Sequence, residues 1–371
     1  MNPDLASGPA GAPAPATEPA ALHTPACELL GIRHPIVQTG MGWVSGARLT
    51  AATSAAGGLG ILAAVTMTPD QLRTAVAEVQ DRTDAPFGVN FRADQPDLAD
   101  RVDFVMGAGV RVVSFAGAPR RDTIARLHDA GLLCVPTVGA RRHAEKMAEW
   151  GADAVIAQGG EGGGHTGTVP TSLLLPHVVD AVGGDIPVLG AGGFHDGRGL
   201  VAALAWGAAG VAMGTRFLLT RESTVPDEVK RRYLAAAVTD TVVTRAIDGS
   251  PQRVIRTEVV DGLERSSSIT RLPRALARAW QFRRLTGTSV RDLLAEGRAM
   301  RRHQDLTLSQ LAMAANAPML IKAALVDGRT EVGVLPTGQG VGVMDELPSV
   351  AELIERIMAE ASATLARLGR S

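Results

Sequence analysis

Short runs of apolar residues alternate along this chain with longer segments in which apolar residues recur at helical spacing. Eight of these runs have the length of a strand, and each is followed by a segment that its spacing predicts to be a helix. The runs are continuously apolar, as expected for parallel strands whose two faces are both covered. The predicted strands are 35–39, 58–64, 87–91, 110–115, 132–138, 154–157, 186–189 and 210–213.

This order of strands and helices predicts an α/β fold, a (β/α)₈ TIM barrel, because each strand-and-helix unit takes roughly 20 to 30 residues. A threonine cap and a proline at Thr68-Pro69-Asp70 predict the start of the second helix. The other helices are expected at 47–56, 98–106, 122–130, 141–150, 173–182, 199–206 and 350–368.

A doubly wound nucleotide-binding sheet is the rival fold. Its fingerprint is G-x-G-x-x-G after the first strand, followed about 20 residues later by an acidic residue that holds a ribose. Here the segment from Gly40 to Ser45 lacks the last glycine, and residues 60–67 contain no acidic residue. The pattern therefore favours the barrel.

The composition changes at both ends of the strand-and-helix pattern. Residues 1–25 carry almost no large apolar side chain and are predicted to form a disordered tail. Residues 222–317 are rich in Arg and Ala at helical spacing, which predicts a helical insertion, or cap, after the eighth strand. The barrel is then expected to comprise residues 26–221 and 318–371.

The overall composition excludes several classes of protein. A formal net charge of −1 argues against a nucleic-acid binder, and no apolar run reaches the about 18 residues of a membrane span. No signal-peptide pattern is seen at the start, so the cytoplasm is the expected compartment. Cys27 and Cys134 have no metal-binding spacing, no metal site is predicted, and Cys134 is expected to be a buried reduced thiol.

The most informative stretch for chemistry is a glycine loop, residues 158–167, which contains six glycines in ten residues. Such a loop costs conformational entropy when it is ordered, which suggests that something bulky approaches its backbone. His165 stands within it, at the end of the sixth predicted strand, where a barrel presents a base or acid to its ligand. The alternative is a mobile surface loop with a solvated histidine.

Two further glycine turns follow the seventh and eighth strands, where barrels often hold a phosphate. The first contains Gly192 and Gly193, and the second contains Gly214 and Thr215. Glycine lets backbone N–H groups approach phosphate oxygens, and a threonine hydroxyl can donate one more hydrogen bond. The alternative is a pair of ordinary tight turns.

Three other strand ends are expected at the same mouth of the barrel. Met41 and Gly42 offer a backbone poor in side chains to the edge of a flat ring, while Asn90 and Gln158 offer amides that can donate and accept, as the uracil-like edge of a flavin requires. The alternative is that both amides satisfy turns at strand ends. Together these residues indicate a phosphorylated aromatic cofactor with His165 over its face.

Seven motifs occur in order along the chain: Pro35 to Gly42, Gly57 to Gly60, Gly88 to Asn90, Glu161 to His165, Ala191 to Gly193, Gly214 to Phe217 and Gly338-Gln339. From about residue 27 to the end, this ordered set resembles the nitronate monooxygenase (2-nitropropane dioxygenase-like) superfamily of FMN-dependent (β/α)₈ barrels. The resemblance is strongest to a branch of steroid-ring acyl-CoA dehydrogenases/reductases.

The resemblance implies where FMN and the catalytic group would lie. It implies a catalytic role for His165, with Gln339 closing over the flavin ring. The FMN contacts that it implies are Met41, Gly42, Asn90, Gln158, Gly192, Gly193, Gly214 and Thr215. Nitronate oxidases of the superfamily place a histidine base at the matching loop, but usually with fewer glycines and with a less basic insertion, so these departures disfavour simple nitronate oxidation.

Three functions stay open on the sequence alone. The first is a flavin oxidoreductase that acts on a CoA thioester with NAD(P) as redox partner, in which His165 moves the proton and insertion residues such as Lys230, Arg231, Arg232, Arg283, Arg284 and Arg301 receive the CoA phosphates. The second is a nitronate monooxygenase that uses O₂. The third is a phosphate-ligand binding barrel without flavin. The acyl group, the reaction direction and the oligomeric state, with a homodimer as one arrangement, are left open.

Overall fold

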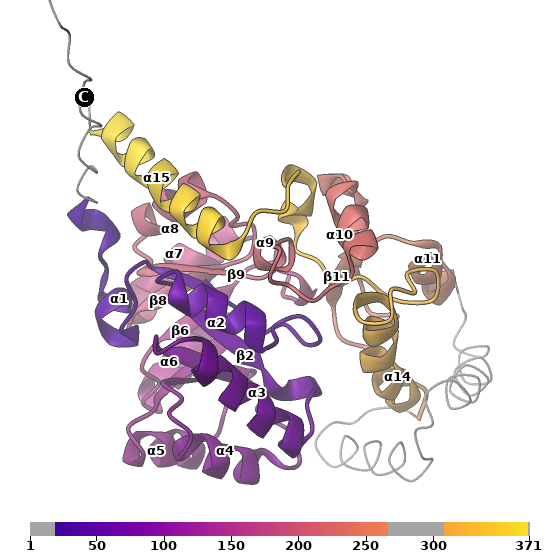
Figure 1. Ribbon diagram of the computed structural model, residues 1–371, viewed down its shortest axis with the longest axis horizontal. Coiled ribbons are helices and arrows are strands. Elements are labelled where there is room, and N and C mark those ends of the chain that lie inside the picture. Colours follow the sequence, from indigo (N-terminus) through magenta and orange to yellow (C-terminus); the bar gives the residue numbers. More distant parts are fainter. Residues whose placement is uncertain (1–18, 266–307, 370–371) are drawn as a thin grey trace, which may run out of the picture.

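A closed barrel of eight parallel strands is the core of the computed structural model, which describes residues 19–265 and 308–369 (Figure 1). The barrel closes because β9 pairs with β1, with Ile36 opposite Val211. The (β/α)₈ prediction is thus confirmed. The barrel strands are β1 (Ile36–Gln38), β2 (Leu59–Ala63), β3 (Phe87–Arg92), β4 (Val112–Ala116), β5 (Leu133–Val138), β6 (Val155–Gln158), β8 (Val188–Ala191) and β9 (Gly210–Met213).

Helices surround the barrel, and several begin where the sequence predicts. Thr68 and Ser349 immediately precede α3 and α15, and each forms a capping box there. Side chains close to each helix start therefore satisfy its free N–H groups. Helices α4 and α15 match their predicted ranges at both ends. The helices that follow the first seven barrel strands are α2 (Ala47–Ala55), α3 (Pro69–Arg82), α4 (Leu98–Met106), α5 (Arg121–Asp129), α6 (Arg141–Glu149), α7 (Thr171–Val182) and α8 (Gly197–Ala205).

The last helix, α15 (Val350–Leu368), packs against α8 and α2 and completes the outer ring (Figure 1). The contact with α8 is close, because a Cβ added at Gly197 would lie 2.3 Å from the carbonyl oxygen of Ile357. None of the helices in the described ranges is long and apolar enough to cross a lipid bilayer.

The start of the chain is ordered earlier than predicted. Residues 1–18 lie outside the described residues, but Ala20–Leu22 form a short 3-10 helix (η1) and Pro25–Leu30 form α1. The Leu22 side chain is buried, and the Thr24 hydroxyl donates to the carbonyl of Ala209, just before β9. The predicted tail is therefore wrong for its last residues, because one leucine and one hydroxyl attach them to the barrel.

The expectation of a wholly helical insertion is wrong for residues 241–255. These form an antiparallel pair, β10 (Thr241–Thr244) and β11 (Gln252–Ile255), between helices α10 (Asp227–Leu234) and α11 (Glu258–Arg265). Residues 266–307 lie outside the described residues, and α14 (Leu308–Leu325) runs across the predicted boundary at 318.

The β10–β11 pair extends to the barrel. Strand β11 also pairs with β7 (Gly164–His165), the two-residue strand inside the glycine loop, so the three form one small antiparallel sheet. The insertion thereby attaches directly to the loop that carries the candidate catalytic histidine. Its β-branched residues at 241–244 favour a strand over a helix.

Cys134 is buried and free, as predicted. Burial, with the nearby charge of Asp153, raises the pKa of this thiol well above its usual range, which keeps it protonated and unreactive.

Candidate active site

The loop after β1 lies against the ends of β3 and β9. A Cβ added at Gly40 would lie 2.4 Å from the Asn90 Cβ, and one added at Gly214 would lie 3.4 Å from the Met41 sulfur. The Met41 N–H donates to the Ser45 hydroxyl at 2.9 Å, which closes a turn around Gly42. Three of the predicted strand ends therefore meet in one place at the carboxyl edge of the barrel.

Both predicted amides are held by protein contacts at their strand ends. Asn90 donates from Nδ2 to the Ser114 hydroxyl at 3.1 Å, and Gln158 donates from Nε2 to the backbone carbonyl of His165 at 2.8 Å. The Gln158 bond folds the glycine loop back over the end of β6. The side-chain amide of Gln158 thus has a structural task in the loop, as the alternative interpretation of the sequence expects.

The two predicted phosphate turns provide unoccupied backbone donors. Gly192 and Gly193 have φ values of 99° and 83°, in the left-handed region that favours glycine. Within the described ranges, the N–H groups of Gly193, Gly214 and Thr215 donate to no oxygen. A Cβ added at Gly193 would meet nothing nearer than Glu161, at 3.6 Å. Free backbone N–H groups of this kind suit a phosphate.

Thr215 adds a hydroxyl to the second turn. Its Oγ1 accepts from the Gly338 N–H at 2.8 Å, which leaves the hydroxyl proton free to donate to an anion. The segment with Gly338 and Gln339 also lies on the glycine loop, because the Gln339 N–H donates to the carbonyl of Glu161 at 2.9 Å. Residues 338–339, which follow the insertion in the sequence, therefore lie at the same end of the barrel as the glycine loop and the second turn.

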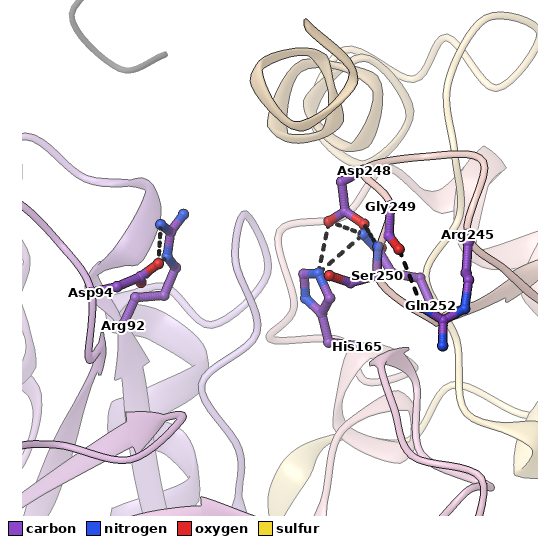
Figure 2. A network of polar contacts seen from close by, with 8 residues as sticks. All are labelled: Arg92, Asp94, His165, Arg245, Asp248, Gly249, Ser250 and Gln252. Atoms are coloured by element: carbon purple, nitrogen blue, oxygen red, sulfur yellow. Dashed lines mark hydrogen bonds and ion pairs between the residues drawn. The ribbon is translucent and has the colours of Figure 1, made fainter. Parts of the chain in front are cut away.

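His165 faces the insertion rather than the barrel interior. Its Nε2 lies 2.7 Å from Oδ2 of Asp248, which is in the turn between β10 and β11, and Gln252 of β11 lies beside both (Figure 2). The His165 side chain is 67% exposed, whereas that of Asp248 is 12% exposed. The ring is therefore held on one side and open on the other.

The charge of Asp248 is stabilised in place. Burial would raise the pKa of Asp248, but the hydrogen bond and charge of His165, the Ser250 N–H and the Gln252 amide together outweigh burial and lower it. Sequence reasoning missed Asp248 and Gln252. The turn residues Asp248 to Pro251, between two runs with β-branched residues, are the hairpin signal that could have found them.

Arg253 attaches the hairpin to the glycine loop. Its guanidinium donates from Nε and from one Nη to the carbonyl of Gly160, at 3.2 and 2.9 Å, and from the other Nη to the Thr241 hydroxyl at 2.8 Å. Burial lowers the pKa of Arg253, and the charge of Glu161 partly offsets this. The planar fork of donors holds loop and hairpin in one arrangement.

The described part of the insertion changes one expectation about basic residues. Lys230, a predicted contact for CoA phosphates, is buried and donates to the carbonyl of Ser223 at 2.9 Å, so it is not free for a ligand. Arg231 and Arg232 are exposed on α10. Arg283, Arg284 and Arg301 lie outside the described residues.

The fold and this arrangement define a (β/α)₈ barrel with its candidate site at the carboxyl ends of the strands. Comparisons with known proteins give the class. The family model described as nitronate monooxygenase matches residues 23–107 and 99–360. The chain belongs to this family and is an oxidoreductase.

Two curated relatives carry the same name, (3aS,4S,5R,7aS)-5-hydroxy-7a-methyl-1-oxo-octahydro-1H-indene-4-carboxyl-CoA dehydrogenase. The protein of Mycobacterium tuberculosis is 60% identical over 92% of this chain and 96% of its own length. That of Rhodococcus jostii is 55% identical over 94% and 98%. Among solved structures, FabK from Thermotoga maritima matches with a TM-score of 0.76 and 35% identity, over 93% of this chain and 98% of that one.

Proposed function

We propose that this chain is an FMN-dependent oxidoreductase that acts at the α,β carbon–carbon bond of an acyl-CoA, a hydroindanone carboxyl-CoA derived from the last two steroid rings. The observation that carries this proposal is the identity of 60% and 55%, over nearly the whole chain, with two relatives named as dehydrogenases of such a CoA thioester. Identity of this extent covers both the barrel and the insertion.

The described residues fit FMN in their hydrogen-bond donors. The free N–H groups of Gly193, Gly214 and Thr215 would hold the phosphate, with the Thr215 hydroxyl as a further donor. Met41, Gly42, Asn90, Gln158, Gly192 and Gln339 are proposed to surround the ring system. FMN, when bound, supplies hydride exchange at its N5 atom. NAD(P) is the proposed redox partner.

His165 is the proposed proton carrier. The carbon next to a thioester carbonyl gives or takes a proton in this reaction, and histidine exchanges protons near neutral pH. The open side of the ring gives a substrate access to it, and the contact with Asp248 holds it in place. The chain's own contribution is therefore to bind the cofactor, orient the ring of His165 and move one proton.

The experiment that tests this role is single-turnover flavin reduction with the CoA thioester named for the two relatives. We expect His165→Ala to slow reduction by about 10²- to 10⁴-fold, the usual contribution of general acid–base catalysis. His177→Ala, an exposed histidine on α7, is the matched control. An unchanged rate in His165→Ala with FMN still bound would remove the proposed role.

A nitronate monooxygenase is the second candidate, favoured by the family whose model matches the chain. The two functions use different co-substrates, so they can be separated directly. Oxygen consumption with propionate-3-nitronate supports the second, and NAD(P)H-linked turnover of an acyl-CoA supports the first. A colourless protein, with no flavin in its absorption spectrum, contradicts both.

A further inference from the structure

The position of His165 depends on residues more than 80 positions away in the chain. In the pairing of β7 with β11, His165 stands directly opposite Gln252. Asp248 lies four residues before Gln252, in the turn that opens β11, and its carboxylate contacts the ring. Figure 2 shows the ring of His165 and the carboxylate of Asp248 pointing toward each other from these two segments.

Asp248 is itself held on both carboxylate oxygens. Oδ1 accepts from the Ser250 N–H at 2.9 Å. Oδ2 accepts from the Gln252 amide at 2.5 Å and faces Nε2 of His165 at 2.7 Å. Gln252 is 1% exposed, so the amide that supports the carboxylate is fixed by its surroundings. A carboxylate restrained in this way can orient a partner with little freedom of its own.

The contact indicates which ring nitrogen carries the proton. An ionised carboxylate has no proton to donate, so Nε2 of His165 must donate to Oδ2. In a neutral imidazole the other nitrogen, Nδ1, is then the acceptor. Since Nε2 is directed at Asp248 and the side chain is 67% exposed, Nδ1 is the nitrogen left for a substrate.

We propose that Asp248, supported by Gln252, is the positioning residue that fixes His165 in the Nε2–H tautomer, so that His165 exchanges the substrate proton through Nδ1. This rests on the proposed function of His165 as proton carrier. In the dehydrogenase direction the substrate C–H bond breaks, an Nδ1–H bond forms, and the electron pair stays on the substrate. The ring becomes a cation and keeps its charged hydrogen bond to Asp248. Asp248 itself does not touch the substrate.

A purely structural role is the competing explanation, in which Asp248 only ties the hairpin to the glycine loop. The two differ in one property of the unmutated holoenzyme. Nitrogen-15 NMR of labelled histidines, with the His165 signals assigned by their loss in His165→Gln, reports the tautomer directly. We expect the Nε2–H form. The Nδ1–H form, or an equal mixture, overturns the proposal without reference to any Asp248 variant.

Variants give the second arm of the test. Asp248→Asn can donate as well as accept and so no longer selects one tautomer; we expect single-turnover flavin reduction to slow by about 10²-fold, below the about 10⁴-fold cost of the same change in a serine-protease triad. KM for the CoA thioester should stay within about twofold. Asp248→Glu should restore part of the rate. Asp240→Asn is the control and should leave the rate unchanged. The native Asp240 carboxylate accepts from the Ala237 N–H in another turn of the same insertion.

The outcomes distinguish this inference from the proposed function. A slow His165→Ala together with an unaltered rate and tautomer in Asp248→Asn overturns the role of Asp248 and leaves that of His165 standing. An unaltered rate in His165→Ala overturns the role of His165 as proton carrier and, with it, the role of Asp248 that rests on it. A rate loss in Asp248→Asn that is accompanied by an equal loss in Asp240→Asn identifies damage to the insertion and also counts against the proposal.

Discussion

The candidate site has two halves that are built in different ways. The phosphate half consists of the turns after β8 and β9, with Gly192, Gly193, Gly214 and Thr215. The histidine half consists of the glycine loop, residues 158–167, and the hairpin β10–β11 that pairs with it. The first offers mainly backbone N–H groups at strand ends, and the second offers one side chain that is held by other side chains.

The difference lies in where the supporting contacts come from. In the phosphate half, the backbone geometry arises where glycine follows a barrel strand, so neighbouring residues largely decide it, and one long-range hydrogen bond, from the Gly338 N–H to the Thr215 hydroxyl, is added. In the histidine half, the supporting contacts join residues 83 positions apart for His165 and Asp248, and 93 apart for Gly160 and Arg253. Binding of the cofactor and positioning of the proton carrier should therefore be separable by mutation.

The largest separable effect is expected in the phosphate half. Thr215→Val removes the hydroxyl and leaves the Gly338 N–H without its acceptor. We expect the Kd for FMN to rise by about 10- to 100-fold, because a hydrogen bond to a charged group contributes about 1.5–3 kcal/mol. Flavin-fluorescence titration of the apoprotein measures it. Thr215→Ser keeps the hydroxyl and is the control, and an unchanged Kd in the valine variant would count against Thr215 as a phosphate contact.

A smaller effect is expected in the histidine half, on turnover and not on FMN binding. Arg253→Lys cannot reproduce the planar fork that joins Gly160 to Thr241. We expect turnover to fall by about 10-fold, since a misplacement of about 1 Å can cost up to about 10²-fold, while FMN affinity stays unchanged. Steady-state kinetics and a flavin titration on one preparation measure both. Arg256→Lys, in an exposed ion pair with Asp261, is the control.

If Arg253→Lys weakens FMN binding as much as it slows turnover, the two halves are one unit and the comparison is wrong. If Thr215→Val lowers the turnover of fully loaded enzyme, the same conclusion follows from the other side. The pair of variants therefore tests the separation more sharply than either one alone.

The smallest effect is expected on the stability of the fold, from the carboxylate of Asp196, three residues after Gly193. Burial would raise the pKa of Asp196, but the Gly199 N–H, Arg198 and His195 outweigh burial and lower it. A folded-state pKa below the unfolded value of about 3.9 stabilises the protein above about pH 4, and this stabilisation is lost as the pH falls through the folded-state pKa.

Asp196→Asn keeps the cap of α8 and removes the charge. We expect a loss of at most about 1 kcal/mol at pH 7, because Arg198 is exposed, and a smaller loss at pH 3. Thermal unfolding at both pH values measures the difference. A gap between the two proteins that does not narrow at pH 3 would show that the charge of Asp196 is not what stabilises this turn.

Much of the barrel could be predicted from the sequence. Strands buried on both faces are continuously apolar, and helices such as α3 and α15 are preceded by capping residues. The local sequence pattern is therefore enough to predict these elements. The positions of the glycine turns after β8 and β9, at strand ends, can be predicted for the same reason. The roles of those glycines, of Asn90 and of Gln339 stay predictions.

The supports of the histidine could not be predicted in the same way. Asp248 gains its importance only when β11 pairs with β7, and strand pairing between distant segments leaves no periodic signal near either partner. Leu22 shows the same limit on a smaller scale: one leucine in an Ala- and Pro-rich segment predicts a tail, although it is buried against the barrel. In both cases the missing information is long-range packing.

The separation of β9 from α15 has a consequence for how this fold accepts new parts. Residues 214 to 349 lie between the eighth barrel strand and the helix that seals its wall against α8 and α2. The entropic cost of closing such an excursion grows only logarithmically, about 0.6 kcal/mol for each doubling of length. A barrel with its insertion point between β9 and α15 can therefore accept a whole inserted domain, or a different one, while the eight strands and their surrounding helices keep the same arrangement.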